Sequence, residues 1–278
     1  MTTDARAVGV QPPGIACAKR SELTGSVLVE VVKHGRGRSA VSNMRASGVL
    51  GIRDTPWGLW IVGTGAQPIG GDRLSVELDL GPGSTMFVRS VGASVARAGP
   101  RQGVESVAAV DARVAAGATL VWAPEPGIAA QGARHRSCGR VALAATSRLA
   151  WLDEVVLGRA SEGPGTWVTS MRIERAGRAE LAFELGSGPG ARGWGAPSVL
   201  DGRPVAVTLV VVDPDRSLPP DASDMIEEVD AVGTILPSAS GSAVQLGVWG
   251  ETLGSCRRVA SDLLARFGPP HWLPEIWP

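Results

Sequence analysis

The chain has 278 residues, 44% of them hydrophobic and 19% charged, and its 27 basic and 27 acidic side chains balance. This composition is typical of a globular protein and excludes a disordered chain. The balanced charge argues against nucleic-acid and anionic-membrane partners, because both need an excess of basic side chains.

The three cysteines, Cys17, Cys138 and Cys256, are odd in number and widely spaced. They form no disulfide framework and favour a reducing compartment. The N-terminal stretch lacks the apolar core of a signal peptide. The longest apolar run, 205–212, is far shorter than the ~20 residues that span a bilayer. We therefore expect a cytoplasmic protein that does not enter a membrane.

Alternation with a period of two residues dominates the chain and predicts β-strands. Strands are expected at 26–32, 57–63, 74–80, 84–91, 106–114, 118–122, 141–157 (interrupted), 167–173, 181–185, 205–212 and 243–249. Residues 175–178 predict a hairpin connection between two of them. With 37 glycines and 20 prolines between the strands, the pattern is mainly β, without an internal repeat of fixed period.

Helix is expected only near the C-terminus. A stripe at steps of three and four residues predicts one helix, and Gly268 ends it. The stripe consists of Leu253, Cys256, Val259, Leu263 and Phe267. A weaker, shorter helix is expected at 222–229, and the Ser/Gly-rich segment 233–245 is expected to be a loop. We expect one domain over 1–278, with disorder in 1–24 and a helix and tail in 250–278.

Two glycine-rich segments, 63–72 and 186–195, lack the Gly-Lys-Ser/Thr sequence and the following helix of a nucleotide site. His135 and Cys138 have a spacing found in metal sites, but a closed site needs about four ligands. Positions three apart on a strand also point to opposite faces. A surface histidine and a buried thiol are the favoured interpretation, and transient metal contact stays open.

Four carboxylates, Glu125, Asp153, Glu154 and Glu162, are close in sequence and could pair for acid–base catalysis. Nothing in the sequence fixes their separation. No Gly-x-Ser-x-Gly nucleophile motif accompanies them. The residues alone therefore favour a β-rich binding or scaffolding domain without catalytic machinery.

Three sequence elements occur in order within the segment 70–167. They are Gly71 and Asp72, then Trp122, Pro124, Glu125 and Pro126, then Glu154, Gly158 and Arg159. In this order they resemble the urease accessory protein UreD family, also called UreH. The chain departs from the family pattern at 89–93, at 162–165, where Glu162 precedes Gly163, and in having no tyrosine.

The resemblance implies a β-helix-like stack of strands with two short C-terminal helices, no enzymatic activity and no tightly bound cofactor. It also implies a scaffold that binds apo-urease, a UreF-type helical accessory protein and, through the complex, a UreG-type GTPase. Such a scaffold supports nickel insertion into urease, with nickel bound only transiently. The alternatives are a carboxylate-dependent β-helical or β-sandwich hydrolase and a stand-alone β-module for a small ligand.

The Pro124-Glu125-Pro126 segment predicts a rigid turn at a strand end, because proline fixes φ and removes an N–H donor. A role for Glu125 at an interface or along a polar interior route is the alternative. Arg159 is expected to act with Glu154 and Glu162 through fixed hydrogen bonds, or else to be an ordinary surface arginine.

The C-terminal tail holds two tryptophans, Trp272 and Trp277, among prolines. Tryptophan in a short exposed tail commonly anchors an interface. The tail is therefore expected to bind the helical accessory partner. The alternative is that the helix and tail pack back on the domain and cap it.

Overall fold

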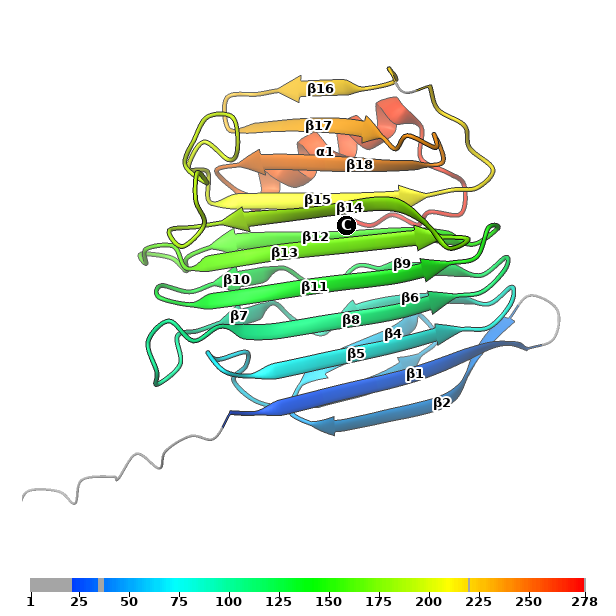
Figure 1. Cartoon of the computed structure of the whole chain (residues 1–278), viewed down its shortest axis with the longest axis horizontal. Helices are drawn as coiled ribbons and strands as arrows, with labels where there is room; N and C mark the ends of the chain where they lie inside the picture. The colour runs from blue at the N-terminus through cyan, green and yellow to red at the C-terminus, as the bar shows by residue number, and fades with distance from the viewer. Residues whose placement is uncertain (1–21, 35–37, 220, 278) are drawn as a thin grey trace, which may run out of the picture.

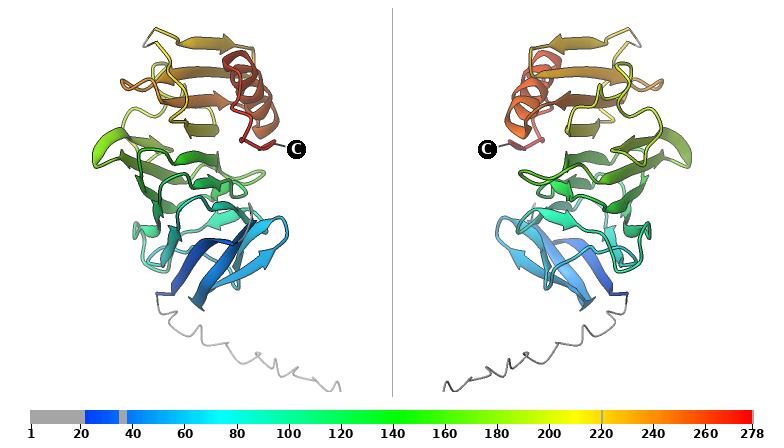
Figure 2. Two further views of the ribbon diagram at one scale, coloured as in Figure 1. Left: turned by 90° about the vertical axis from the view of Figure 1, so that its right-hand side faces the viewer. Right: turned by 90° about the vertical axis from the view of Figure 1, so that its left-hand side faces the viewer.

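The computed structural model describes residues 22–34, 38–219 and 221–277. Most of the segment expected to be disordered, 1–24, lies outside these residues. Two β-sheets are stacked face to face, and the chain winds between them (Figures 1 and 2).

The smaller sheet has seven strands. Their spatial order is β14 (Arg178–Ser187), β13 (Thr166–Arg175), β11 (Arg134–Leu143), β8 (Ser106–Val114), β5 (Arg73–Leu80), β1 (Thr24–His34) and β2 (Arg38–Gly48).

The larger sheet has eleven strands. Nine of them follow the order β16 (Asp224–Glu227), β17 (Ala231–Pro237), β18 (Ala243–Gly250), β15 (Val205–Val212), β12 (Arg148–Leu157), β9 (Thr119–Trp122), β6 (Thr85–Ser90), β4 (Gly58–Gly63) and β3 (Leu50–Thr55). The short strands β7 (Ser94–Ala96) and β10 (Gly127–Ala129) pair with each other, and β10 also pairs with β12.

The chain alternates between the sheets, so that β5, β8, β11 and β13 pair in parallel in one sheet and β6, β9 and β12 in the other. The expected β-helix-like stack is confirmed, with about four turns. Register aligns Val76 with Val110, Val110 with Gly139, and Gly139 with Met171. These aligned positions are unequally spaced in the sequence, which explains the lack of a fixed-period repeat.

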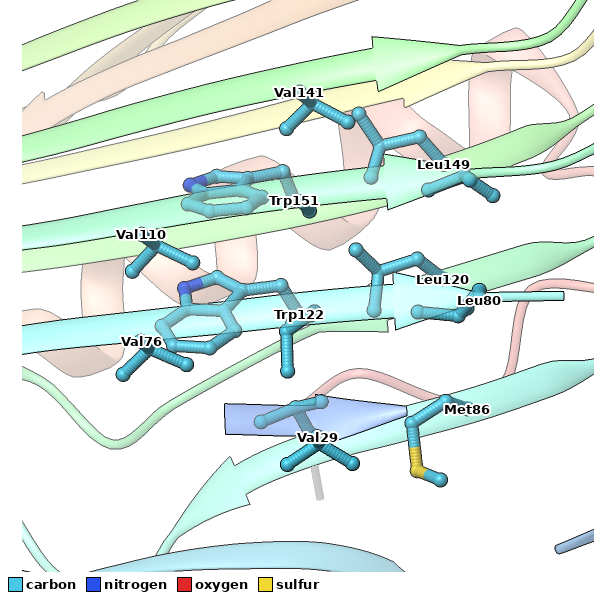
Figure 3. Close-up of a cluster of buried hydrophobic side chains, with 14 of the residues drawn as sticks. Val29, Val76, Leu80, Met86, Val110, Leu120, Trp122, Val141, Leu149 and Trp151 are labelled. Atoms are coloured by element: carbon cyan, nitrogen blue, oxygen red, sulfur yellow. The ribbon is translucent and has the colours of Figure 1, made fainter. Parts of the chain in front are cut away.

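The main core lies between the two sheets (Figure 3). Alternate residues of each strand point into it, because successive side chains of a strand point to opposite faces. Trp122 of β9 and Trp151 of β12 stack with ring centroids 5.0 Å apart and planes 19° apart. Side chains at equivalent positions in neighbouring turns of the stack therefore pack against each other.

One helix, α1 (Leu253–Phe267), covers the outer face of the larger sheet where that sheet extends beyond the smaller one (Figure 2). Cys256, Val259 and Leu263 of the predicted stripe are buried against β15, β17 and β18. The side chain of Thr252 accepts a hydrogen bond from the Ser255 N–H at the N-terminus of α1. Gly268, at φ 74°, ends the helix as expected.

Two local expectations near the C-terminus are wrong. The weaker helix at 222–229 is strand β16, so the described residues contain one helix instead of two. The segment 233–245 is largely strand, belonging to β17 and β18, and only its serine-rich centre turns. Strands β2, β3, β7 and β10 were also not predicted from the sequence. In these segments pairing with neighbouring strands outweighs weak local propensity.

The remaining strand expectations agree more closely with the structure. The hairpin between β13 and β14 is confirmed. The interrupted strand at 141–157 is the end of β11 followed by the whole of β12. The reason for the interruption is that the chain crosses from one sheet to the other at this point.

Candidate partner interface

The Pro124-Glu125-Pro126 segment ends β9 as expected, but the expected turn is wrong. Both β9 and β10 run parallel to β12, so the segment is an extended link that continues in the same direction. The Glu125 N–H donates to Ser90 Oγ at 2.9 Å, and the Pro126 carbonyl accepts from the Ser94 N–H at 2.9 Å. A Cβ on the next residue, Gly127, would lie 2.3 Å from the Trp167 ring. The link is therefore fixed on both sides, and the Glu125 side chain is exposed.

A buried charge cluster lies on the same outer face of the larger sheet. Glu154 of β12 has no exposed side-chain surface, and Arg257 of α1 donates two hydrogen bonds to its carboxylate, at 2.8 and 2.6 Å. The indole N–H of Trp277 donates a third, at 2.9 Å. Three donors satisfy the buried carboxylate, so this cluster joins the strand, the helix and the tail.

Glu125 lies close enough to Arg257 to act on it electrostatically. The hydrogen-bonded Glu154 carboxylate raises the pKa of the Arg257 guanidinium, and the Glu125 charge adds to this effect. Arg257 thus lies between a buried carboxylate and an exposed one. Arg257 was not predicted from the sequence. The available signal was its place beside Cys256, which lies on the predicted apolar stripe.

The tail packs back on the domain in the described residues. Trp277 is 9% exposed, and the Trp272 indole N–H donates to Asp213 Oδ2 at 3.1 Å. The Arg216 guanidinium lies 4.2 Å from the centre of the Phe267 ring and donates to the Phe267 carbonyl. The expectation of an exposed tail is therefore wrong for Trp277, whereas partner binding by the tail stays a prediction.

Gly71 and Asp72 form a structural corner before β5. Gly71 has φ 100°, a conformation that favours glycine. Asp72 is 2% exposed, and its carboxylate accepts from the N–H groups of Leu23 and Ile69 at 3.0 and 2.9 Å. These bonds fix the start of the parallel pair β1 and β5.

Gly158 and Arg159 follow β12. Gly158 has φ 87°, and a Cβ there would lie 3.0 Å from the Glu162 carbonyl oxygen. Arg159 Nε donates to Glu162 at 2.9 Å in an exposed turn. The expected partnership of Arg159 with Glu154 is wrong, because Glu154 points to the outer face and pairs with Arg257. The effect of Arg159 on complex assembly stays a prediction.

The four carboxylates considered for acid–base catalysis have different partners. Glu154 is bound by Arg257, Glu162 by Arg159, and Glu125 is exposed between β9 and β10. Asp153 points the opposite way from Glu154, between the sheets, where it accepts from the Trp151 indole N–H at 3.0 Å. Burial raises the pKa of Asp153 to about 6.

His135 and Cys138 lie three positions apart on β11, so their side chains point to opposite faces of the strand. His135 is 2% exposed, within hydrogen-bond distance of Ser106 Oγ (2.9 Å) and against the Trp167 ring. Burial lowers the pKa of His135 to about 3, so the ring is neutral. The expected surface position of His135 is wrong, because the residue lies at an inward position of β11, which faces the core. The described residues contain no group of three or more His, Cys, Asp or Glu able to hold a metal.

The chain matches a known protein family over most of its length. A family model described as the UreD urease accessory protein matches residues 24–277. The chain belongs to the UreD family.

Individual UreD proteins resemble the chain over most of its length. Urease accessory protein UreD 3 of Streptomyces griseus subsp. griseus is 37% identical over 196 residues, covering 66% of this chain and 76% of the relative. The UreD of Streptomyces avermitilis is 33% identical, covering 84% and 93%. The UreD of a Parafrankia species is 30% identical, covering 90% and 92%. The resemblance inferred from sequence elements is thus confirmed.

The UreD sequence elements divide into two structural groups. Gly71, Asp72 and Gly158 fix backbone corners, whereas Glu125 and Glu154 lie beside Arg257 on the outer face of the larger sheet. None of the helices in the described part of the chain is both long and apolar enough to cross a membrane.

Proposed function

We propose that this chain is a non-enzymatic urease maturation factor of the cytoplasm. It binds apo-urease, a UreF-type helical accessory protein and, through the complex, a UreG-type GTPase, and it supports nickel insertion into the urease active site. The observation that carries the proposal is the UreD family match over 24–277. The arrangement of the side chains supports a scaffold, because the carboxylates considered for catalysis are each engaged elsewhere or exposed alone.

The transport of nickel through this protein is part of the proposal. Nickel is cargo here and must leave again, so the protein needs weak contacts instead of a closed shell of about four ligands. The described residues contain no group of three or more His, Cys, Asp or Glu that could hold a metal, so the proposal assigns this chain no closed nickel site. No step of the proposal requires this chain to hydrolyse GTP or urea.

The small-ligand alternative receives less support. A groove of about 560 Å³ crosses the outer face of the smaller sheet, lined by charged side chains including Glu77, Asp79 and Arg113. Arg140 and Asp111 form an ion pair across it at 3.5 Å. Small-ligand pockets are mostly apolar with a few converging polar groups. This open, charged surface is better suited to a protein than to a small molecule.

A gene deletion in a urease-positive host tests the proposal. The deleted strain should accumulate urease protein with little nickel and low activity at limiting nickel, and the wild-type gene should restore both. Urease activity and nickel per urease, measured by mass spectrometry on the purified enzyme, are the readouts. Full activity with normal nickel content in the deleted strain would contradict the proposal.

A further inference from the structure

An aromatic–arginine patch lies on the outer face of β3, β4 and β6. Its strand side chains point away from the core, because their strand neighbours Ile52, Leu59 and Val88 are buried between the sheets. Trp57 and Val91 lie just beyond the ends of β3 and β6 and are exposed. The patch consists of Arg53, Trp57, Trp60, Val62, Phe87, Arg89 and Val91.

The centre of this patch is a row of three side chains. Arg53, Trp60 and Arg89 are register partners on three adjacent strands, which lie roughly 4.8 Å apart. Within the described residues neither arginine forms an ion pair, and Arg53 donates only to the carbonyl of its neighbour Ile52, at 3.1 Å. A half-buried tryptophan is thus flanked by two cationic groups without counter-charges.

A rigid turn presents a second tryptophan beside this row. Trp57 is 83% exposed at the turn between β3 and β4. Thr55 Oγ1 accepts from the Trp57 N–H at 3.2 Å and donates to the Gly58 carbonyl at 2.8 Å. A Cβ on Gly58 would lie 2.5 Å from the Phe87 carbonyl oxygen, so this position requires glycine. The turn is fixed in shape while its largest apolar side chain faces solvent.

The C-terminal tail covers the neighbouring part of the same face and meets the patch at Phe87. Ile276 and Trp277 belong to the cluster that contains Val121 and Ala123, with Phe87 packed at its edge. Beyond this edge Val91 is 62% exposed. The exposed apolar surface is therefore continuous with a covered one, as at an interface that another chain completes.

We propose that the aromatic–arginine patch binds an acidic segment of a protein partner in urease maturation. An apolar side chain of the segment packs between Trp57 and Trp60, and its carboxylates pair with Arg53 and Arg89. Tryptophan and arginine are the residue types that contribute most to binding at interfaces, and guanidinium–carboxylate bonds add orientation. The choice of partner rests on the proposed function, whereas the chemistry of the segment follows from the two unpaired arginines.

Purified apo-urease and purified UreF-type protein of the same host are the two probes, each titrated against wild type and variants by biolayer interferometry. Trp60→Ala and the charge reversal Arg53→Glu with Arg89→Glu should each weaken one of the two complexes at least tenfold. Trp57→Ala should weaken the same complex and, at an exposed position, should leave folding unchanged. The matched control Arg178→Glu, an exposed unpaired arginine at the β13–β14 hairpin, should bind as wild type does.

Unchanged affinity of all patch variants for both probes would overturn the proposal. A wild-type dimer in solution that the patch variants dissociate would also overturn it, because a second copy would then occupy the patch. Failure of the proposed function would give a different result from failure of the patch proposal. The wild-type chain would bind neither probe, and the gene deletion would leave urease activity intact.

Discussion

At the scale of single residues, neighbouring carboxylates on one strand have opposite environments. Glu154 faces outward and is held by Arg257 and Trp277, whereas Asp153 faces inward with the Trp151 indole as its hydrogen-bond donor. Burial without a cation disfavours the charged form of a carboxyl group, while a guanidinium partner favours it. Alternation along β12 therefore sets which carboxylate is paired and which has a raised pKa.

Replacing Asp153 by asparagine should change how stability depends on pH. Burial raises the pKa of Asp153 from 3.8 to about 6 in the folded state. Between these values the folded state binds more protons than the unfolded state, so this carboxyl lowers stability progressively as pH rises from about 4 to 6. The full shift corresponds to about 3 kcal/mol. Partial exposure of Asp153 reduces the expected effect to on the order of 1–2 kcal/mol.

Urea unfolding of wild type and Asp153→Asn at pH 4.5 and 7.0 is the measurement. The stability of the variant relative to wild type should increase between these two pH values. The matched control Asp111→Asn, on an exposed carboxylate of the outer sheet face, should show no such increase. A pH-independent difference for Asp153→Asn would contradict the assigned environment.

At the scale of secondary-structure elements, the helix and tail are part of the domain core. The apolar stripe of α1 and the side chains of Ile276 and Trp277 share one cluster with β15 and β18. Arg257 and Trp277 both donate to the buried Glu154 carboxylate. The tail therefore contributes to folding even if it also takes part in partner binding.

Shortening or changing the tail should reduce stability. Trp277→Ala removes a buried indole and should cost about 3 kcal/mol, and deletion of 270–278 at least as much. Trp277→Phe keeps most of the apolar area but removes one donor to Glu154, and should cost about 1 kcal/mol. His271→Ala, at an exposed position of the same tail, is the control and should be neutral. Urea unfolding followed by circular dichroism tests the series, and a truncated chain as stable as wild type would refute it.

At the scale of the whole molecule, the two-sheet stack places the potential metal ligands His135 and Cys138 in different environments. His135 is enclosed by Ser106 and Trp167, while Cys138 lies three residues further along β11. Burial raises the pKa of the Cys138 thiol, which disfavours the metal-binding thiolate. These separations predict weak nickel binding by the isolated protein.

Calorimetric titration of the isolated chain with nickel should show only weak binding, because the described residues contain no group of three or more His, Cys, Asp or Glu able to hold a metal. The His135→Ala, Cys138→Ala double variant should titrate as wild type does. A Cys17→Ser variant is the control for the segment before residue 22. Submicromolar affinity that the double variant loses would contradict the prediction.

The sequence by itself determined the mainly β class, the principal strands, the stripe of α1 and its end at Gly268. These features depend on local alternation, helical spacing and backbone conformation, which neighbouring residues specify. It also indicated the UreD family, and the end of β9 at Pro124-Glu125-Pro126, because proline has no N–H to donate to a neighbouring strand.

Only the tertiary structure decided which residues meet. Strand β16 forms at the sheet edge by pairing with β17, and β17 pairs with β16 on one side and β18 on the other; the local sequence does not predict these partners. The sequence does not show that Glu154 meets Arg257, 103 positions away, or that Trp277 completes the pair. Their meeting depends on the winding of the stack, on the extension of the larger sheet and on the docking of α1. Contacts between distant segments follow from the packing of whole sheets, which no short stretch of sequence encodes.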